Sequence, residues 1–166
     1  MLNMDFTQAV LIDTNKLDWV ASPMSGVFRK PLAREGAERG HATSLVQYEA
    51  GSVFRPHPHP LGEEILVLSG VFSDQQGDFE AGSYFRVLPL YMFGMERVWL
   101  VRIQNGDNLL SELDLASSVE LFVISGQASY GELPLSSGMW LREPQFLSNQ
   151  WNVESSCFIW LKSGHF

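Results

Sequence analysis

The sequence has little cysteine, little positive charge and no long apolar run, and each shortage excludes a class of protein. A single cysteine among 166 residues, Cys157, excludes an internal disulfide and fits a reducing compartment. Eleven Lys and Arg against 19 Asp and Glu give a net charge of −8, so the chain lacks the basic patch that nucleic-acid binding requires. No apolar run approaches the roughly eighteen residues of a membrane span, and the first residues lack the pattern of a secretory signal. We therefore predict a cytoplasmic protein that binds neither nucleic acid nor membrane.

Apolar residues recur in short runs that glycine, proline, asparagine and aspartate interrupt. The runs are rich in β-branched and aromatic residues, and no long segment holds the 3.6-residue period of a helix. They lie at residues 42–48, 64–68, 83–86, 98–103, 119–124 and 157–161. This pattern predicts an all-β sandwich or barrel.

The stretch at residues 51–70 carries the most chemistry and holds two of the four histidines. His57 and His59 stand one residue apart, and Glu63 follows four residues later. Alternate side chains of an extended segment point to the same face, so the two histidines share a direction. A turn through residues 60–62 can then bring Glu63 back towards them. Two imidazoles and one carboxylate are ligands that a divalent metal ion accepts.

The spacing of this stretch, Gly-x5-His-x-His-x3-Glu-x6-Gly, resembles the first signature motif of the cupin family. The continuation as far as Ala81-Gly-Ser-Tyr-Phe-Arg86 is similar to a narrower group, the cupin domain of ChrR-type anti-sigma factors and their stand-alone relatives. The resemblance implies β-barrels of the double-stranded β-helix or jelly-roll kind. It also implies one divalent metal at His57, His59 and Glu63. Zinc is the metal that the family implies, with iron, nickel and manganese as alternatives.

The sequence also repeats itself at an offset of 56 residues, the step from Gly70 to Gly126. Residues 63–86 align with residues 119–142 without a gap. We therefore predict two cupin-like units in tandem. The first spans residues 1–86 and contains the metal motif, and the second, degenerate unit spans residues 87–166.

The second predicted unit lacks the metal ligands, and the first lacks a fourth ligand and its closing strands. At the offset of 56, the three ligand positions of the first unit become Leu113, Leu115 and Val119. The second unit is therefore expected to be structural. In the family, a histidine seven residues after the arginine that matches Arg86 supplies a fourth ligand, and here that position is Phe93. The first barrel is expected to lack this ligand and its closing strands.

Two expectations concern how the incomplete first unit is completed. His41, which precedes the run at residues 42–48, is the candidate substitute ligand, although a histidine in such a place more often caps a turn or faces solvent. Missing strands would leave unpaired strand edges, which residues 1–25, the second unit or another subunit must cover. We expect a homodimer.

Three functions stay open for this sequence, and no catalytic residue is assigned. The resemblance implies a regulatory or sensory module whose metal meets a small ligand or oxidant. A sigma factor is not expected as partner, because no anti-sigma zinc motif precedes residue 41. Two histidines and one carboxylate also match the non-haem iron oxygenases, which suggests a dioxygenase of a small chelating substrate such as a diketone. The third function is that of a structural cupin with a vestigial site.

Overall fold

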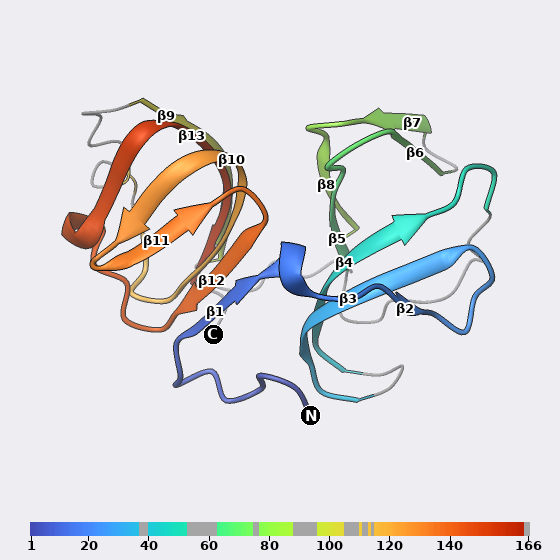
Figure 1. Ribbon diagram of the computed structural model, residues 1–166, viewed down its shortest axis with the longest axis horizontal. Helices are drawn as coiled ribbons and strands as arrows, with labels where there is room; N and C mark the ends of the chain where they lie inside the picture. The colour runs from blue at the N-terminus through green and yellow to red at the C-terminus, as the bar shows by residue number, and fades with distance from the viewer. Residues whose placement is uncertain are drawn as a thin grey trace. The chain divides into compact units, whose positions relative to one another are not determined.

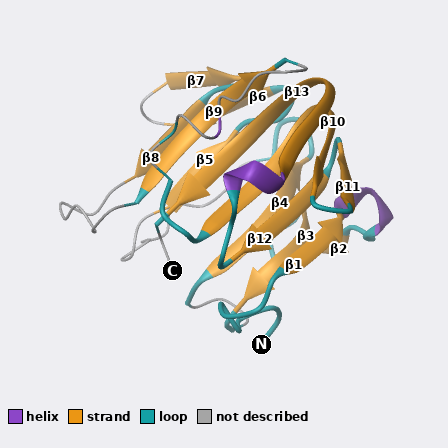
Figure 2. Ribbon diagram, turned by 90° about the vertical axis from the view of Figure 1, so that its left-hand side faces the viewer, coloured by secondary structure: helices purple, strands orange, loops and turns teal. Residues whose placement is uncertain are grey.

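Strands dominate the computed structural model of the chain (Figure 1, Figure 2). The structure describes residues 1–36, 40–52, 63–74, 77–87, 96–104, 110, 113 and 115–164, without the side chains of residues 63, 74 and 85–87. Every strand pair that these residues form is antiparallel. The predicted all-β class is confirmed, and the antiparallel sheets are consistent with a cupin jelly roll. Among the described residues, no helix has the length and apolar character needed to cross a membrane.

The largest sheet has six strands. They are β1 (Val10–Asp13), β9 (Arg97–Ile103), β10 (Val119–Tyr130), β11 (Leu133–Ser136), β12 (Met139–Glu143) and β13 (Trp151–Ser163). Their order is β1–β12–β10–β13–β9, and β11 also pairs with β10. The two longest strands, β10 and β13, run side by side along the whole sheet (Figure 1). β10 therefore has neighbours on both edges over most of its length.

Three smaller sheets contain the other described strands. One consists of β2 (Val20–Ala21), β3 (Val27–Arg34) and β4 (Ala42–Tyr48). The other two are the pair β5 (Glu63–Leu66) with β8 (Tyr84–Val87) and the pair β6 (Val71–Asp74) with β7 (Gly77–Glu80). Two 3-10 turns, η1 (Thr14–Lys16) and η2 (Ser148–Gln150), connect strands of the chain.

The chain forms two compact units. One consists of residues 1–54 and 94–166, and the other of residues 55–93. This division follows contacts in space, whereas the expected boundary at residue 86 follows the sequence repeat. The boundary at residue 86 therefore stays a prediction.

Both faces of the six-stranded sheet are covered by apolar residues. The core on one face, here called the inner core, contains Val119, Leu121 and Val123, which are fully buried. The core on the other face, the outer core, joins Phe122 and Trp140 of the sheet to Leu32 and Ala33 of β3. This arrangement follows from the alternation of side chains along β10. Each buried side chain of this size stabilises the fold by about 1.5–3 kcal/mol.

Two parts of the chain share one pattern of strand register. Adding 56 to both members of the four β5–β8 pairs gives the four β10–β12 pairs. The same step converts the four β6–β7 pairs into the four β10–β11 pairs. The pair Glu64–Arg86, for example, corresponds to Glu120–Arg142. The glycines at matching positions all have positive φ: Gly70 with Gly126, and Gly82 with Gly138.

β10 departs from a regular ladder at Gly126. Register shifts against β13 lie on both sides of this residue. Its φ is 92°, and a Cβ atom there would overlap the carbonyl oxygen of Ser156 and lie 2.8 Å from Cα of Cys157. Only glycine combines this left-handed backbone with so close an approach of β13.

We predict that Gly126→Ala lowers the free energy of unfolding by about 3 kcal/mol, because it adds a clash with the β13 backbone to the cost of a left-handed alanine. Urea unfolding measured by circular dichroism tests this. The matched control is Gly131→Ala, since Gly131 has a φ of 56° but its nearest neighbour, an oxygen of Gln150, is 3.5 Å from the added Cβ. The control should cost about 1 kcal/mol. Equal losses in the two variants would contradict the close-approach argument.

Candidate functional site

The structure describes the predicted ligands only in part. Glu63 is the first residue of β5 and is paired with Val87 of β8. The side chain of Glu63 lies outside the described residues, as do His57 and His59 entirely. The three-ligand set therefore stays a prediction.

Glu64, the second residue of β5, is half-buried, and its Oε1 atom is fully buried. Its cross-strand neighbour is Arg86. Because side chains alternate along a strand, a site that used the preceding position would lie on the face opposite to Glu64.

The positions that match the three ligands at the offset of 56 lie together in the structure. Leu113 and Leu115 pack against the inner core, and Val119 belongs to it with 0 % exposure. These aliphatic side chains carry no donor atom, so a metal ion has no ligand among them. All three positions nevertheless adjoin the same core.

His41 lies on the surface where the turn between β3 and β4 ends. The carbonyl of His41 accepts a hydrogen bond from the Glu35 amide at 3.0 Å, and the amide of His41 donates to Glu35 Oε2 at 3.3 Å. Its ring meets the edge of Phe6, with 6.0 Å between ring centroids. The described part of the chain holds no group of three His, Cys, Asp or Glu side chains able to bind a metal ion. The role of His41 as a substitute ligand therefore stays a prediction.

A buried polar cluster occupies the outer face of the six-stranded sheet. Glu120 and Arg142 are cross-strand neighbours, and both are buried. Trp140 donates its Nε1 hydrogen to Glu120 Oε1 at 2.7 Å. On the other side of Glu120 stands Lys162 of β13, which forms an ion pair with Glu96 at 3.1 Å. The charges of the cluster alternate in sign, which compensates the cost of burying them.

Arg142 binds the N-terminal segment to this sheet through hydrogen bonds. Its two terminal nitrogens donate to the carbonyls of Asn3 and Asp5, at 2.6 and 3.1 Å. The guanidinium lies over the ring of Phe6, 4.8 Å from its centroid. Burial lowers the pKa of Arg142, while the carboxylates of Glu120 and Asp5 raise it. An arginine side chain keeps its charge in proteins, and the role of Arg142 is structural.

This cluster could not be predicted directly from the sequence, although one residue pointed to it. Glu120 interrupts an otherwise apolar run, Val119-Glu-Leu-Phe-Val-Ile124. A charged residue within a run that is buried on both faces requires a partner of opposite sign. Arg142 and Lys162, on the two neighbouring strands, satisfy that requirement.

Cys157 is a buried residue of the inner core, as the apolar run around it indicates. Burial raises the pKa of its thiol to about 11. The thiolate is the form that attacks electrophiles and binds metals, so a thiol of this pKa is unreactive near neutral pH. Cys157 is therefore a packing residue.

A comparison with protein families finds a match. The family model described as the ChrR cupin-like domain matches residues 7–90, half of the chain. The matched range contains the whole Gly51–Gly70 motif. A search of curated proteins finds no match.

We predict that Arg142→Gln lowers the free energy of unfolding by about 3 kcal/mol, since it breaks a buried charge cluster. It should also speed hydrogen exchange at the amides of residues 2–6, because the two bonds to Asn3 and Asp5 are lost. Urea unfolding and exchange mass spectrometry measure these effects. The control is Arg102→Gln on β9, whose side chain lies over Phe158 in an exposed position. An Arg142 variant that behaves like the Arg102 variant would contradict the structural role.

Proposed function

The chain belongs to the ChrR cupin-like domain family, and we propose that it is a metal-binding cupin that responds to a small ligand or oxidant. The observation that carries the proposal is the complete Gly-x5-His-x-His-x3-Glu-x6-Gly spacing inside the matched range. His57, His59 and Glu63 are the proposed ligands. Regulation or sensing is the proposed role, without a sigma factor as partner.

Two features of the described residues support a site at these positions. The register of β5–β8 equals that of β10–β12 at the offset of 56, so Glu63 corresponds to Val119 on a core-facing position. The residues that correspond to His57 and His59, Leu113 and Leu115, pack against that same core. Ligands that replace these three side chains would face one common interior.

The donor set fits a borderline divalent ion. Imidazole nitrogens and a carboxylate oxygen suit zinc, and they also suit iron, nickel and manganese. Zinc is the proposed ion. A bound ion of this kind supplies Lewis acidity and open coordination positions. Glu63 would reduce the net charge of the site by one, and both histidines must be neutral at the nitrogen that binds.

A second candidate function is that of a dioxygenase. The observation that favours it is Phe93, which stands where the family has a fourth histidine. A set of two histidines and one carboxylate leaves three adjacent positions for dioxygen and a chelating substrate such as a diketone. If the site holds no metal at all, the chain is a structural cupin.

We also propose that the chain consists of two cupin units in tandem, at residues 1–86 and 87–166. The eight residue pairs of β5–β8 and β6–β7 that coincide with those of β10–β12 and β10–β11 at the offset of 56 support this proposal. The inner core of the second unit consists of apolar side chains, which suits a structural role.

We predict that the protein purified without added metal contains about one divalent ion per chain, and that His57→Ala and Glu63→Gln each remove most of it. Elemental analysis by plasma mass spectrometry measures this. Glu64→Gln is the matched control, because it makes the same change on the opposite face of β5 and should retain the metal. His41→Ala tests the substitute ligand, and a loss of metal in that variant would add His41 to the set.

The identity of the ion separates the candidate functions. Zinc supports the sensory module, whereas iron together with oxygen uptake in the presence of acetylacetone supports the dioxygenase. A protein without metal supports the structural alternative. Metal content that is unchanged in His57→Ala would overturn the assignment of the ligands.

We further predict a homodimer. Among the described strands, β5 pairs only with β8, whereas the matching strand β10 pairs with β12 on one edge and β13 on the other. A strand from a second copy is proposed to pair with the edge of β5 that no described strand covers. Sedimentation velocity at micromolar concentration measures the association state. A single monomeric species at every concentration would contradict the prediction.

A further inference from the structure

The first residues of the chain connect two sheets. Residues 2–6, here called the strap, begin with Leu2, whose amide and carbonyl exchange hydrogen bonds of 2.8 Å with the backbone of Arg34 at the end of β3. The carbonyls of Asn3 and Asp5 accept hydrogen bonds from Arg142 of β12, at 2.6 and 3.1 Å. The strap is therefore bound both to the three-stranded sheet and to the six-stranded sheet.

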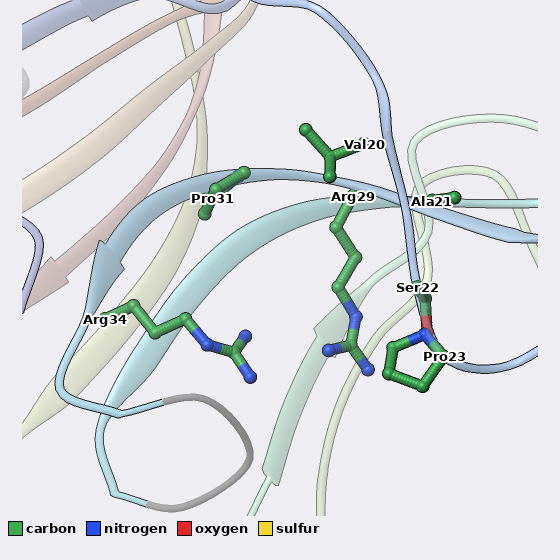
Figure 3. Close-up of a pocket in the computed structure, with 7 residues that line it drawn as sticks. All are labelled: Val20, Ala21, Ser22, Pro23, Arg29, Pro31 and Arg34. Carbon is green, nitrogen blue, oxygen red and sulfur yellow. The ribbon is translucent and has the colours of Figure 1, made fainter.

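A β-bulge in β3 determines which side chains face the strap. In a regular strand, Arg29 and Arg34 would lie on opposite faces, because their separation is five residues. The register shift between Pro31 and Ala33 brings both arginines to the face that lines a small pocket, which Figure 3 shows. Bulges redirect side chains in this way, and they occur often beside functional sites.

The strap binds at the extra residue of this bulge. The described pairs of β3 with β4 pass from Pro31 to Ala33 and give Leu32 no partner on β4. The carbonyl of Leu32 accepts a hydrogen bond from the side-chain amide of Asn3 at 2.7 Å. The side chain of Leu32 is buried in the outer core. The bulge thus supplies one acceptor to the strap and one apolar side chain to the core.

The backbone of the strap has an unusual conformation at Asn3. Its φ is 50°, and in the described part of the chain it is the one residue other than glycine with a positive φ. A left-handed backbone is unfavourable for L-residues, although asparagine tolerates it better than most. Such a conformation persists only where the surrounding contacts impose it, and it is found often in segments that switch. We therefore expect the strap to leave this conformation when its contacts weaken.

Met4 is the side chain through which the strap contacts the outer core. It is half-buried and packs against that core, whereas Leu2 is 40 % exposed. It lies between Asn3 and Asp5, the two residues whose carbonyls Arg142 binds. A half-buried thioether has apolar neighbours and is still accessible to a small oxidant. A chemical change at Met4 therefore acts at the centre of the strap.

We propose that Met4 is an oxidation site and that its sulfoxide releases the strap from the outer core. A peroxide is the oxidant. The sulfur lone pair attacks one peroxide oxygen, the O–O bond breaks, and the other oxygen takes up the proton and leaves as water, or as an alcohol from an organic peroxide. The sulfur is oxidised by two electrons and the peroxide is reduced by two. The sulfoxide is polar, so its burial against apolar side chains is unfavourable and the strap detaches.

Met139 is half-buried as well, but its oxidation is not expected to have this effect. It packs against the inner core, outside the strap, and its sulfur accepts a hydrogen bond from the amide of Ser136 at 3.2 Å. A sulfoxide oxygen is an acceptor too, so an oxidised Met139 can keep this bond. Met4 is therefore the methionine whose oxidation should release the strap.

Hydrogen exchange of the full chain, freed of metal by a chelator and treated with hydrogen peroxide, tests the proposal. Mass spectrometry of peptides locates the oxidised methionines, and NMR follows the amides of Leu2 and Arg34, which donate the two hydrogen bonds between the strap and β3. We expect oxidation of Met4 and exchange at these amides that is at least about tenfold faster. Reduction by methionine sulfoxide reductases should restore the slow exchange.

Three variants separate Met4 from the other methionines. Met4→Leu keeps an apolar side chain but has no thioether, so peroxide should change its exchange rates by less than about twofold. Met4→Gln places a polar group at the same position and should exchange fast without peroxide. Met139→Leu should respond to peroxide as the unmodified chain does.

Each of three results would overturn the proposal. The first is a Met4 that stays reduced while Met1, which is 99 % exposed, is oxidised. The second is complete oxidation of Met4 with unchanged exchange at Leu2 and Arg34. The third is a Met4→Leu variant that responds to peroxide like the unmodified chain. None of these results depends on the proposed metal centre, because the metal has been removed and its proposed ligands are not changed.

Discussion

The structure depends on the pairing of β10 with β13, because β9, β11 and β12 each join one of these two strands and β1 is attached through β12. β12 and β11 share the remaining edge of β10, and β9 covers the remaining edge of β13. β10 and β13 therefore lie at the centre of the sheet, and both faces of β10 are buried over its first residues. The sequence must then provide apolar side chains on two faces at once. Where it provides charges instead, as at Glu120, Arg142 and Lys162, they must neutralise one another.

The strands themselves could be predicted from the sequence, but their lengths could not. The runs at residues 42–48 and 98–103 coincide closely with β4 and β9. The run at residues 119–124 marks only half of β10, which continues to Tyr130. Glycine normally ends such a run, whereas Gly126 allows the strand to continue through an irregular stretch where β13 comes too close for a side chain. β13 likewise extends well beyond the run at residues 157–161, because its first residues pair with β10 although several of them are polar and exposed.

The candidate sites differ in how far the sequence could indicate them. His57, His59 and Glu63 lie close together in the sequence, so their spacing can be recognised without knowledge of the fold. The cluster of Glu120, Arg142 and Lys162 arises from pairing between distant strands, so only the isolated charge in an apolar run pointed to it. The position of Arg29 and Arg34 on one face of β3 could not be predicted. Regular alternation assigns the two side chains to opposite faces, and the bulge at residues 31–33 reverses that assignment.

The common register of the two halves relates stability to the proposed chemistry. At one set of positions the chain carries Leu113, Leu115 and Val119, and burial of each is worth about 1.5–3 kcal/mol. At the matching positions it carries two histidines and a glutamate, whose burial costs free energy unless hydrogen bonds or an ion compensate it. A chain with polar groups at both sets would lose this apolar stabilisation twice. Polar side chains buried at such positions would need a bound ion to compensate the cost of their burial, which agrees with the metal proposed for His57, His59 and Glu63.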